Sequence, residues 1–309
     1  MSLSFITFIS IYILYIFTSA IFIIIDRNKD WISVKYESGL QNVYVIISDK
    51  RSDYEDIKNT ISAGLLKKHK IIFNSLDGYQ HDKDIIISDG LKHSITIGKD
   101  ICEDVGVGKE YRGSAAYVVY DYEDITDMYC EHIYARKTHT PAYILETNNY
   151  IVREECENDL EELYRLYDTL SDCPFIEPLY EVEREKEFLS AYISNMYGFF
   201  DYGMWLVFDK KTGELVGRMG IENRSIDGVN CQELGYLVGR KYQRRRIAYE
   251  VCSKIVEYAR ESLCIDRLYA CIHKDNIPSI NFINKMKFKL YAKDIDDMDI
   301  YVRQLDENK

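Results

Sequence analysis

The segment ELGYLVGRKYQRRRIAYEV, residues 233–251, carries the pattern that decides the fold of the carboxy-terminal half. It begins as an apolar strand, crosses a basic turn with three consecutive arginines, and continues with the apolar spacing of a helix. A loop that enters a helix directs unpaired N–H groups and the positive end of the helix dipole toward an anion. The segment therefore predicts a strand, an anion-binding loop and a helix in succession.

Short strands and amphipathic helices alternate on both sides of this segment. In chain order we expect strand 150–154, a helix through 160–166, helix 182–197, strands 205–208, 215–221 and 232–238, helix 247–262, strand 268–273, helix 279–285 and strand 300–303. Hairpin turns such as the Lys-Thr-Gly at 211–213 separate successive strands, which favours antiparallel pairing. The class expected for this region is mixed α+β.

This succession, together with NIPSINFINKMKF at 276–288, resembles the GNAT superfamily of N-acetyltransferases, in particular the branches that acetylate protein N-termini and small amines. The resemblance covers residues 149–306. It implies a mixed-sheet acyltransferase domain that takes its acetyl group from acetyl-CoA. It also implies an acceptor that is a primary amine, on either a small molecule or a peptide.

The acetyl-CoA loop of the family reads Q/R-x-x-G-x-G/A. This chain has, in the same places, Gln243, Arg244, Arg245, Arg246, Ile247 and Ala248. The resemblance implies that these residues cradle the pyrophosphate of the cofactor. It further implies that the cofactor's pantetheine arm and neighbouring groups are contacted by Leu237, Val238, Asn276 and Ser279.

Two features of this proposed cofactor site have a second interpretation. The central glycine of the family loop is Arg246 here, and a Cβ at this position is expected to crowd the phosphates or to push the side chain outward. A run of arginines is also typical of a basic surface turn. Likewise, the Asn-x-x-Ser pattern from Asn276 to Ser279 is typical of an ordinary helix cap.

Acyl transfer requires a neutral amine, and a carboxylate is able to remove the proton directly or through water. Glu233 is the candidate base, with Glu222 on the preceding strand as its rival. The alternative for Glu233 is a strand carboxylate that faces solvent or pairs with an arginine. The tyrosine that protonates the departing thiolate in many relatives is Ile283 here, and Tyr291 and Tyr301 are candidate substitutes.

An aromatic cluster lies between the second helix and the next strand of this domain. Its members are Tyr197, Phe199, Phe200, Tyr202 and Trp205. The resemblance implies an acceptor-side wall at this place, and core packing explains the cluster equally well.

The amino-terminal residues 5–25 contain no charged side chain, and a helix of this length measures about 30 Å, which spans a bilayer core. We therefore expect a transmembrane helix over residues 4–25, in preference to a cleaved signal peptide or a buried helix or strand. Arg27, Lys29 and Lys35 follow the run, whereas no Lys or Arg precedes it. This asymmetry predicts a membrane anchor with the remaining domains on the cytoplasmic side.

Residues 41–142 predict a small, Rossmann-like parallel α/β domain. Apolar runs at 42–48, 84–88 and 115–119 predict strands, and helical spacing is found at 54–68 and 125–135. Asp49, Asp89 and Asp121 follow these strands, at the edge where ligands of such folds bind. Glycines at 106, 108 and 113 lack the G-x-G-x-x-G spacing and predict a loop, and no catalytic motif assigns a role to the domain.

The composition excludes several classes of function. The chain of 309 residues is 47% hydrophobic and carries a formal net charge of -12, which disfavours binding to nucleic acid. Its eight cysteines contain no C-x-x-C pair and do not cluster with histidine, so we expect reduced thiols and no metal site.

The sequence thus predicts a membrane-tethered N-acetyltransferase with Glu233 as its base. Two alternatives stay open. One is a regulatory module that binds CoA without efficient chemistry, because Arg246 and Ile283 replace a glycine and a tyrosine. The other is an interaction protein whose domain at 41–142 recognises a partner.

Overall fold

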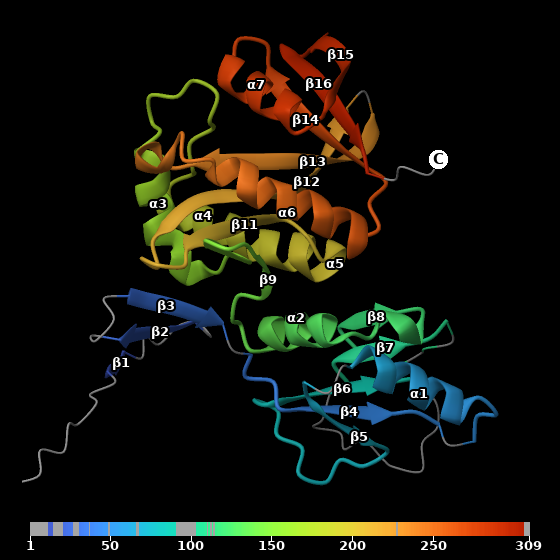
Figure 1. The fold of residues 1–309 in the computed structure, drawn as a ribbon. Coiled ribbons are helices and arrows are strands. Elements are labelled where there is room, and N and C mark those ends of the chain that lie inside the picture. Colours follow the sequence, from blue (N-terminus) through green and yellow to red (C-terminus); the bar gives the residue numbers. More distant parts are fainter. Residues whose placement is uncertain are drawn as a thin grey trace, which may run out of the picture. The chain divides into compact units, whose positions relative to one another are not determined.

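The computed structural model describes residues 12–14, 21–26, 31–36, 38–48, 50–65, 68–90, 103–109, 111, 113, 115–226 and 228–305. The chain divides into two compact units (Figure 1). One unit is Glu37–Ala142, and the other comprises Met1–Tyr36 and Tyr143–Lys309.

The amino-terminal segment contains strands where the sequence predicted a helix. Strands β1 (Tyr12–Leu14), β2 (Ile21–Asp26) and β3 (Trp31–Tyr36) form an antiparallel sheet in the order β1-β2-β3. The predicted transmembrane helix over 4–25 is therefore wrong at residues 12–14 and 21–25, and the rest of that range lies outside the described residues. Runs rich in isoleucine favour strands, and an apolar run alone does not distinguish the two structures.

Within the part of the chain that the structure describes, no helix combines the length and the apolar character needed to cross a membrane.

The unit Glu37–Ala142 contains a parallel five-stranded sheet in the order β5-β4-β6-β7-β8. The strands are β4 (Asn42–Ile46), β5 (Lys70–Phe73), β6 (Asp84–Ser88), β7 (Val105–Val107) and β8 (Tyr117–Val119). Helices α1 (Tyr54–Gly64) and α2 (Asp127–Lys137) and the 3-10 turn η1 (Tyr122–Asp124) complete it. The first strand lies inside the sheet, so the chain winds outward in both directions, as in doubly wound folds.

The core of this unit explains why its sequence pattern was informative. Strands β4 and β6 are buried on both faces, since Val43 and Ile85 belong to one buried cluster, and Tyr44 and Ile86 to another. Such strands have continuous apolar sequences, which the sequence analysis detected. Strands β5 and β7 were not predicted. The first has only four residues, and the second is a Val-Gly-Val segment within the expected glycine loop.

The carboxy-terminal unit is built on a mixed sheet of eight strands in the order β15-β16-β14-β13-β12-β11-β10-β9. The strands are β9 (Tyr143–Glu146), β10 (Tyr150–Arg153), β11 (Met204–Asp209), β12 (Leu215–Ile226), β13 (Val229–Val238), β14 (Arg267–His273), β15 (Lys289–Ile295) and β16 (Met298–Gln304). All neighbouring strands are antiparallel except β13 and β14, which are parallel.

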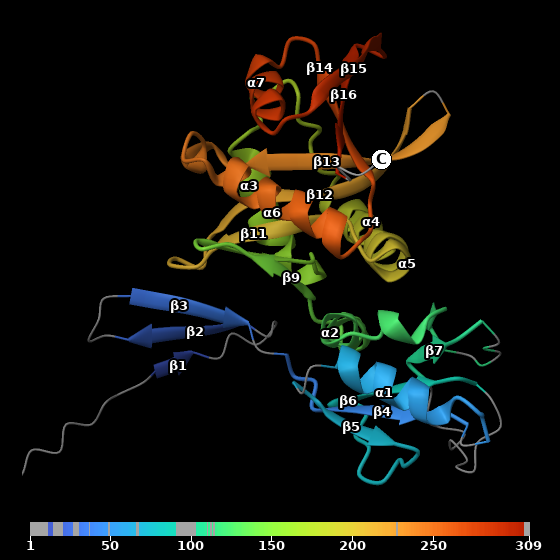
Figure 2. The same ribbon diagram turned by 45° about the vertical axis from the view of Figure 1, so that its right-hand side comes forward.

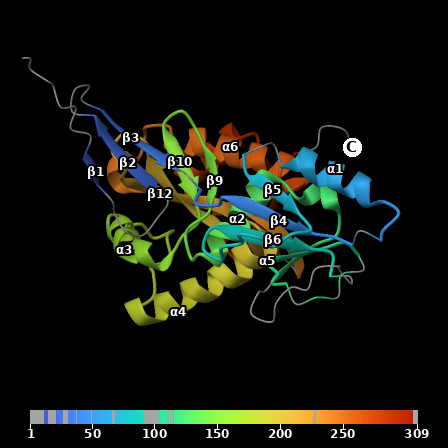
Figure 3. The same ribbon diagram turned by 90° about the horizontal axis from the view of Figure 1, so that it is seen from below.

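Helices cover both faces of this sheet, as Figure 3 shows from below. They are α3 (Leu160–Asp168), α4 (Val182–Tyr192), the π-helical turn η3 (Ile193–Tyr197), α5 (Gly198–Phe200), α6 (Ile247–Glu261) and α7 (Ile277–Lys285), with 3-10 turns η2 (Glu157–Asp159) and η4 (Arg240–Tyr242). Leu163 and Leu166 of α3 pack with Leu206 on one face. On the other face, Tyr258 of α6 contacts the buried ring of Trp205.

The expected succession of elements between residues 150 and 304 is found, with two additions at the edges. Strand β9 precedes residue 149 and pairs with β10, and β15 is an edge strand with exposed side chains and interrupted pairing. Strand β9 has only four residues, and three of the seven residues of β15 are charged. The predicted helix 182–197 is interrupted, because its last five residues form the π-helical turn η3.

Candidate active site

The sheet opens between β13 and β14. Their pairing is recorded at a single position, Glu233 opposite Tyr269, whereas β13 pairs with β12 over ten positions. In Figures 1 and 2, β14 and its neighbours fan away from β12 and β13. The stretch that contains Leu237 and Val238 is therefore bonded to β12 on one edge and faces an opening on the other.

Glu233 lies at the point where the two strands diverge. Its side chain is largely buried, with 13% exposed. One carboxylate oxygen accepts a hydrogen bond from the N–H of Cys271 at 2.9 Å, and the other lies 3.0 Å from Nη1 of Arg224. The carboxylate thus bridges β13 to β14 and also forms an ion pair on β12.

Glu222 lies directly opposite Glu233 in the pairing of β12 with β13, so both carboxylates are on the same face of the sheet. Burial raises the pKa of Glu222, and the nearby charge of Glu233 raises it further, although Arg218 opposes both effects. The hydroxyl of Tyr192 from α4 approaches Glu222 at 3.4 Å. The two carboxylates therefore have different surroundings.

A buried polar network holds α3 and α4 against this face. Arg218 of β12 forms an ion pair with Glu155 and a 3.1 Å hydrogen bond to the hydroxyl of Tyr167. The hydroxyl of Tyr192 accepts from the N–H of Met204 at 2.7 Å. Burial raises the pKa values of Tyr192 and of Glu155, and Arg218 lowers both. Buried networks of this kind fix side chains in position, because an unpaired member is costly.

The sequence did not predict a role for Glu155, Tyr192 or Arg218. The sequence contains a signal for one of these residues, because Arg218 is a charged residue within an apolar strand. Its neighbours Val216 and Met219 are fully buried. A charged residue in such a strand requires a partner. The identity of the partner was not readable, since Glu155 is 63 residues away in the sequence.

The predicted cofactor loop connects the open strand β13 to helix α6. Gln243 through Arg246 are exposed, and Nε2 of Gln243 donates to the carbonyl of Val238 at 3.1 Å. The first bond of α6 runs from the N–H of Glu250 to the carbonyl of Arg246. The N–H groups before Glu250 have no partner within their helix, which is the usual condition at a helix start. An exposed, cationic helix start thus follows the opening.

Arg244 and Arg246 adopt left-handed backbone conformations, with φ of 62° and 64°. This explains why the family pattern has glycine at the position of Arg246, since glycine reaches positive φ without a steric cost. The side chain of Arg246 is exposed and forms no hydrogen bond or ion pair among the described residues.

The other predicted cofactor contacts have structural roles. Asn276 caps α7, with its side chain accepting from the N–H of Ser279 at 3.3 Å. Ser279 in turn accepts, through its carbonyl, a 3.4 Å bond from the hydroxyl of Tyr236 on β13. These contacts tie the start of α7 to the open strand.

The two candidate general acids lie on strands beyond β14, and the ring centre of Tyr291 is 6.0 Å from that of Tyr269, the residue that pairs with Glu233. Ile283, in the position of the family's tyrosine, is fully buried. Tyr291 is 65% exposed on β15, and Tyr301 is buried on β16. These strands stand at the far end of the sheet order, beyond β14. The predicted aromatic wall is divided as well, because Tyr197 and Trp205 are core residues, whereas Phe199 and Phe200 are exposed.

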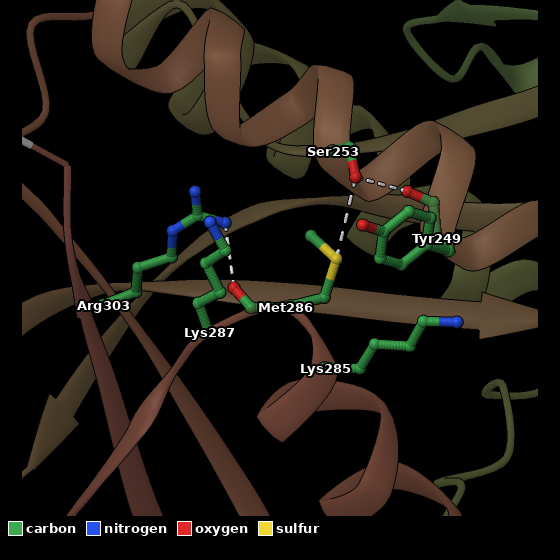
Figure 4. A pocket seen from close by; sticks show the side chains of 6 residues that line it. All are labelled: Tyr249, Ser253, Lys285, Met286, Lys287 and Arg303. Carbon is green, nitrogen blue, oxygen red and sulfur yellow. Dashed lines mark hydrogen bonds between the residues drawn. The ribbon is translucent and has the colours of Figure 1, made fainter.

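A pocket of about 160 Å³ lies beside the first turns of α6 (Figure 4). It is lined by Tyr249, Ser253, Lys285, Met286, Lys287 and Arg303. Three of these six residues are cations, and Nζ of Lys285 lies 4.8 Å from the ring centre of Tyr249. The arginine of the pocket donates to the carbonyl of Met286 at 2.9 Å. This pocket was not predicted from the sequence, because its members come from three separate elements.

The carboxy-terminal part of the chain is similar to known proteins. Residues 150–289 match the model of the family described as the Acetyltransferase (GNAT) domain. A curated relative named "Uncharacterized N-acetyltransferase p20" from Bacillus licheniformis is 33% identical over 81 residues, covering 26% of this chain and 44% of the relative. The "Uncharacterized protein YkkB" from Bacillus subtilis (strain 168) is 25% identical over 147 residues, covering 47% of this chain and 84% of the relative.

A "Putative GnaT-family acetyltransferase from Bordetella pertussis" is 18% identical, with a TM-score of 0.45, and the match covers 51% of this chain and 96% of the other.

Residues 150–289 therefore form a GNAT acetyltransferase domain. Enzymes of this class transfer an acetyl group from acetyl-CoA. The domain occupies the part of the chain that contains the open strands, the two carboxylates and the arginine loop.

The conformation of Arg246 leads to a stability prediction. Arg246→Gly removes the steric strain of an arginine in a left-handed backbone conformation. We therefore expect the free energy of unfolding to stay unchanged or to rise by up to about 1 kcal/mol. Arg245 has no positive φ, and Arg245→Gly is expected to lower stability by about 0.5–1 kcal/mol through chain entropy. Urea denaturation of the two variants measures both effects. A larger loss for Arg246→Gly than for Arg245→Gly would contradict the assigned conformation.

Proposed function

We propose that the protein transfers an acetyl group from acetyl-CoA to a primary amine, on a small molecule or a protein N-terminus. The observation that carries the proposal is the single pairing between β13 and β14, because it leaves an opening that leads to a cationic helix start. The proposal assigns the chemistry to residues 149–306. Residues 41–142 are proposed as a separate domain whose role is unassigned.

Cofactor binding is assigned to the loop Gln243–Arg246 with Ile247 and Ala248, and to the backbone of Leu237 and Val238. Phosphate groups are stabilised by helix N-termini and by guanidinium groups. The chain has a net charge of -12, yet cations gather around the first turns of α6. They are Arg244, Arg245, Arg246, Lys285, Lys287 and Arg303. This local reversal of charge favours a polyanionic ligand such as CoA.

We further propose that the pocket beside α6 receives the 3′-phosphate end of CoA. Its lysines lie beyond the loop along α6, so one ligand with phosphates at two places fits the cation distribution. Asn276 and Ser279 are proposed to support the site from the start of α7, through the contact of Ser279 with Tyr236.

The proton of the amine is proposed to pass to one of the two adjacent carboxylates. Both carboxylate oxygens of Glu233 are already engaged, one by Arg224 and the other by the N–H of Cys271, so we assign Glu233 a positioning role. The raised pKa of Glu222 makes it the better proton acceptor, since a base works best when its pKa approaches the operating pH. This reverses the preference drawn from sequence, where Glu233 was the candidate and Glu222 its rival.

The second candidate function is a module that binds CoA with little turnover. The absence of the family's tyrosine at Ile283 is the observation that favours it. Turnover does not require that tyrosine, because a CoA thiolate is a tolerable leaving group with a thiol pKa of roughly 8.5. Calorimetric binding of CoA without acetyl transfer to any amine would favour the module.

Replacement of each carboxylate tests the division of roles. Because burial raises the pKa of Glu222, the base form is lost at higher pH than for an ordinary glutamate, whose pKa is about 4.3. The acid limb of kcat/KM is therefore expected above that value. Glu222→Gln should remove the limb and lower kcat about 10²- to 10⁴-fold, with the KM for acetyl-CoA unchanged.

Glu233→Gln is the matched variant. It should keep the acid limb of the pH profile of kcat/KM, and it should lower kcat less than Glu222→Gln does. If Glu233→Gln loses the acid limb and Glu222→Gln keeps a normal kcat, Glu233 is the general base and the proposed division of roles is wrong. Circular dichroism of both variants checks that the sheet is intact.

The pocket is tested with two donors, acetyl-CoA and acetyl-dephospho-CoA, which lacks the 3′-phosphate. The double variant Lys285→Ala/Lys287→Ala should raise the KM for acetyl-CoA about tenfold, as expected for lost charged contacts of about 1.4 kcal/mol. The KM for the dephospho donor should not change. Lys289→Ala, an exposed lysine outside the pocket, is the control. An equal rise with both donors would show that the pocket does not receive that phosphate.

A further inference from the structure

A path of aromatic rings leads from the surface to Glu222. Tyr180 and Phe188, each 42% exposed, have ring centres 5.7 Å apart. Phe188 and Tyr192 follow at 5.8 Å, and the hydroxyl of Tyr192 approaches Glu222 at 3.4 Å. Phe188 and Tyr192 are one helical turn apart on α4, so they lie on the same side of it. The three rings thus connect solvent to the proposed base.

The surroundings of this path are acidic. Residues 177–187 contain five glutamates and two cations. Lys186 is paired with Glu183, and Arg184 lies over the ring of Tyr180 at 4.0 Å. The carboxylates of Glu177, Glu181 and Glu187 form no ion pair among the described residues, and all three are exposed. The path therefore has unpaired negative charge beside exposed aromatic faces.

Aromatic faces and carboxylates together recognise cations. The contact between Arg184 and Tyr180 is an example of such recognition within the chain, because a guanidinium group lies over the face of the ring. A cationic acceptor is also attracted by the net charge of the molecule. An acidic acceptor would meet repulsion at the same place.

The exposed apolar surface extends past the path. Beyond Tyr192, the π-helical turn η3 leads to α5, where Phe199 is 80% exposed and Phe200 is 41% exposed. Figure 3 shows α4 and α5 along one helical course. Exposed apolar surface of this extent is typical of contacts with proteins, since a small amine covers only one pocket.

We infer that the acceptor is a polypeptide amino terminus followed by basic residues, which lies along Tyr180, Phe188 and Tyr192 with its α-amine at Glu222. The inference rests on the proposed acetyl transfer and adds the class of acceptor. In this arrangement the basic side chains contact the rings and the glutamates at 181 and 187. The α-ammonium group loses one proton to Glu222, and its nitrogen attacks the acetyl carbonyl carbon of acetyl-CoA. The C–N bond forms as the C–S bond breaks, and CoA leaves as a thiolate that takes up the second amine proton to become the free thiol.

The test uses the full chain and acetyl-CoA, with thiol release as the readout. Three peptides share the same first residue and length and carry lysine, glutamine or glutamate at positions three, four and six. A linear triamine serves as the small cationic acceptor for comparison with the peptides. We expect kcat/KM for the basic peptide to exceed that for the neutral one about tenfold, equivalent to about 1.4 kcal/mol. The preference should shrink in 0.5 M NaCl, because salt screens exposed charges.

Variants along the path sharpen the test. Phe188→Ala and the double variant Glu181→Gln/Glu187→Gln should each raise the KM for the basic peptide about tenfold. Neither variant should change the KM for acetyl-CoA. With a small amine as acceptor, kcat should change by no more than about twofold. Glu261→Gln, an exposed carboxylate at the end of α6, is the matched control and should change neither KM.

The outcomes separate this inference from the proposed function. Equal rates for the three peptides, a preference for the acidic peptide, or a triamine better than every peptide would each overturn the inference while leaving acetyl transfer intact. Absence of turnover with every amine would overturn the proposed function, and the inference with it.

Discussion

The carboxylate of Glu233 occupies the place where β13 and β14 separate, and the arrangement of the acetyltransferase domain depends on this contact. In a continuous parallel ladder, the N–H of Cys271 would bond to a backbone carbonyl of the neighbouring strand. Here it donates to the side chain of Glu233, which keeps a partly buried N–H satisfied while the strands diverge. Arg224 balances the charge from the other side. A sheet can therefore open in its interior without leaving a backbone donor unpaired.

The charges of the domain are distributed around that opening in two groups. Cations gather on the loop before α6 and in the pocket beside it, whereas unpaired carboxylates gather on and before α4. These elements cover opposite faces of the sheet (Figure 3). The distribution fits a reaction between an anionic donor and a cationic acceptor that approach from different sides. The buried network of Glu155, Arg218 and Tyr192 fixes the side chains on the α4 side of the sheet, because each member has a specific partner.

The sequence predicted the parts of this structure that depend on local pattern. Apolar runs located β4, β6 and β13, and the order of elements around residues 233–251 indicated the family. Contacts between distant residues were not predictable. The bond from Cys271 to Glu233 spans 38 residues, and the pair of Glu155 with Arg218 spans 63. The amino terminus was predicted wrongly at residues 12–14 and 21–25, because a long apolar run is compatible with strands as well as with a helix.

The central claim is that acetyl-CoA lies between β13 and β14 with its phosphates at the start of α6. Amide hydrogen exchange of the full chain, with and without saturating CoA, tests it most directly, since amides that gain a partner exchange more slowly. We predict slower exchange at residues 234–238 and 244–249, and unchanged exchange in the sheet of residues 42–119. Bound CoA that leaves both of the first two segments unchanged would contradict the account.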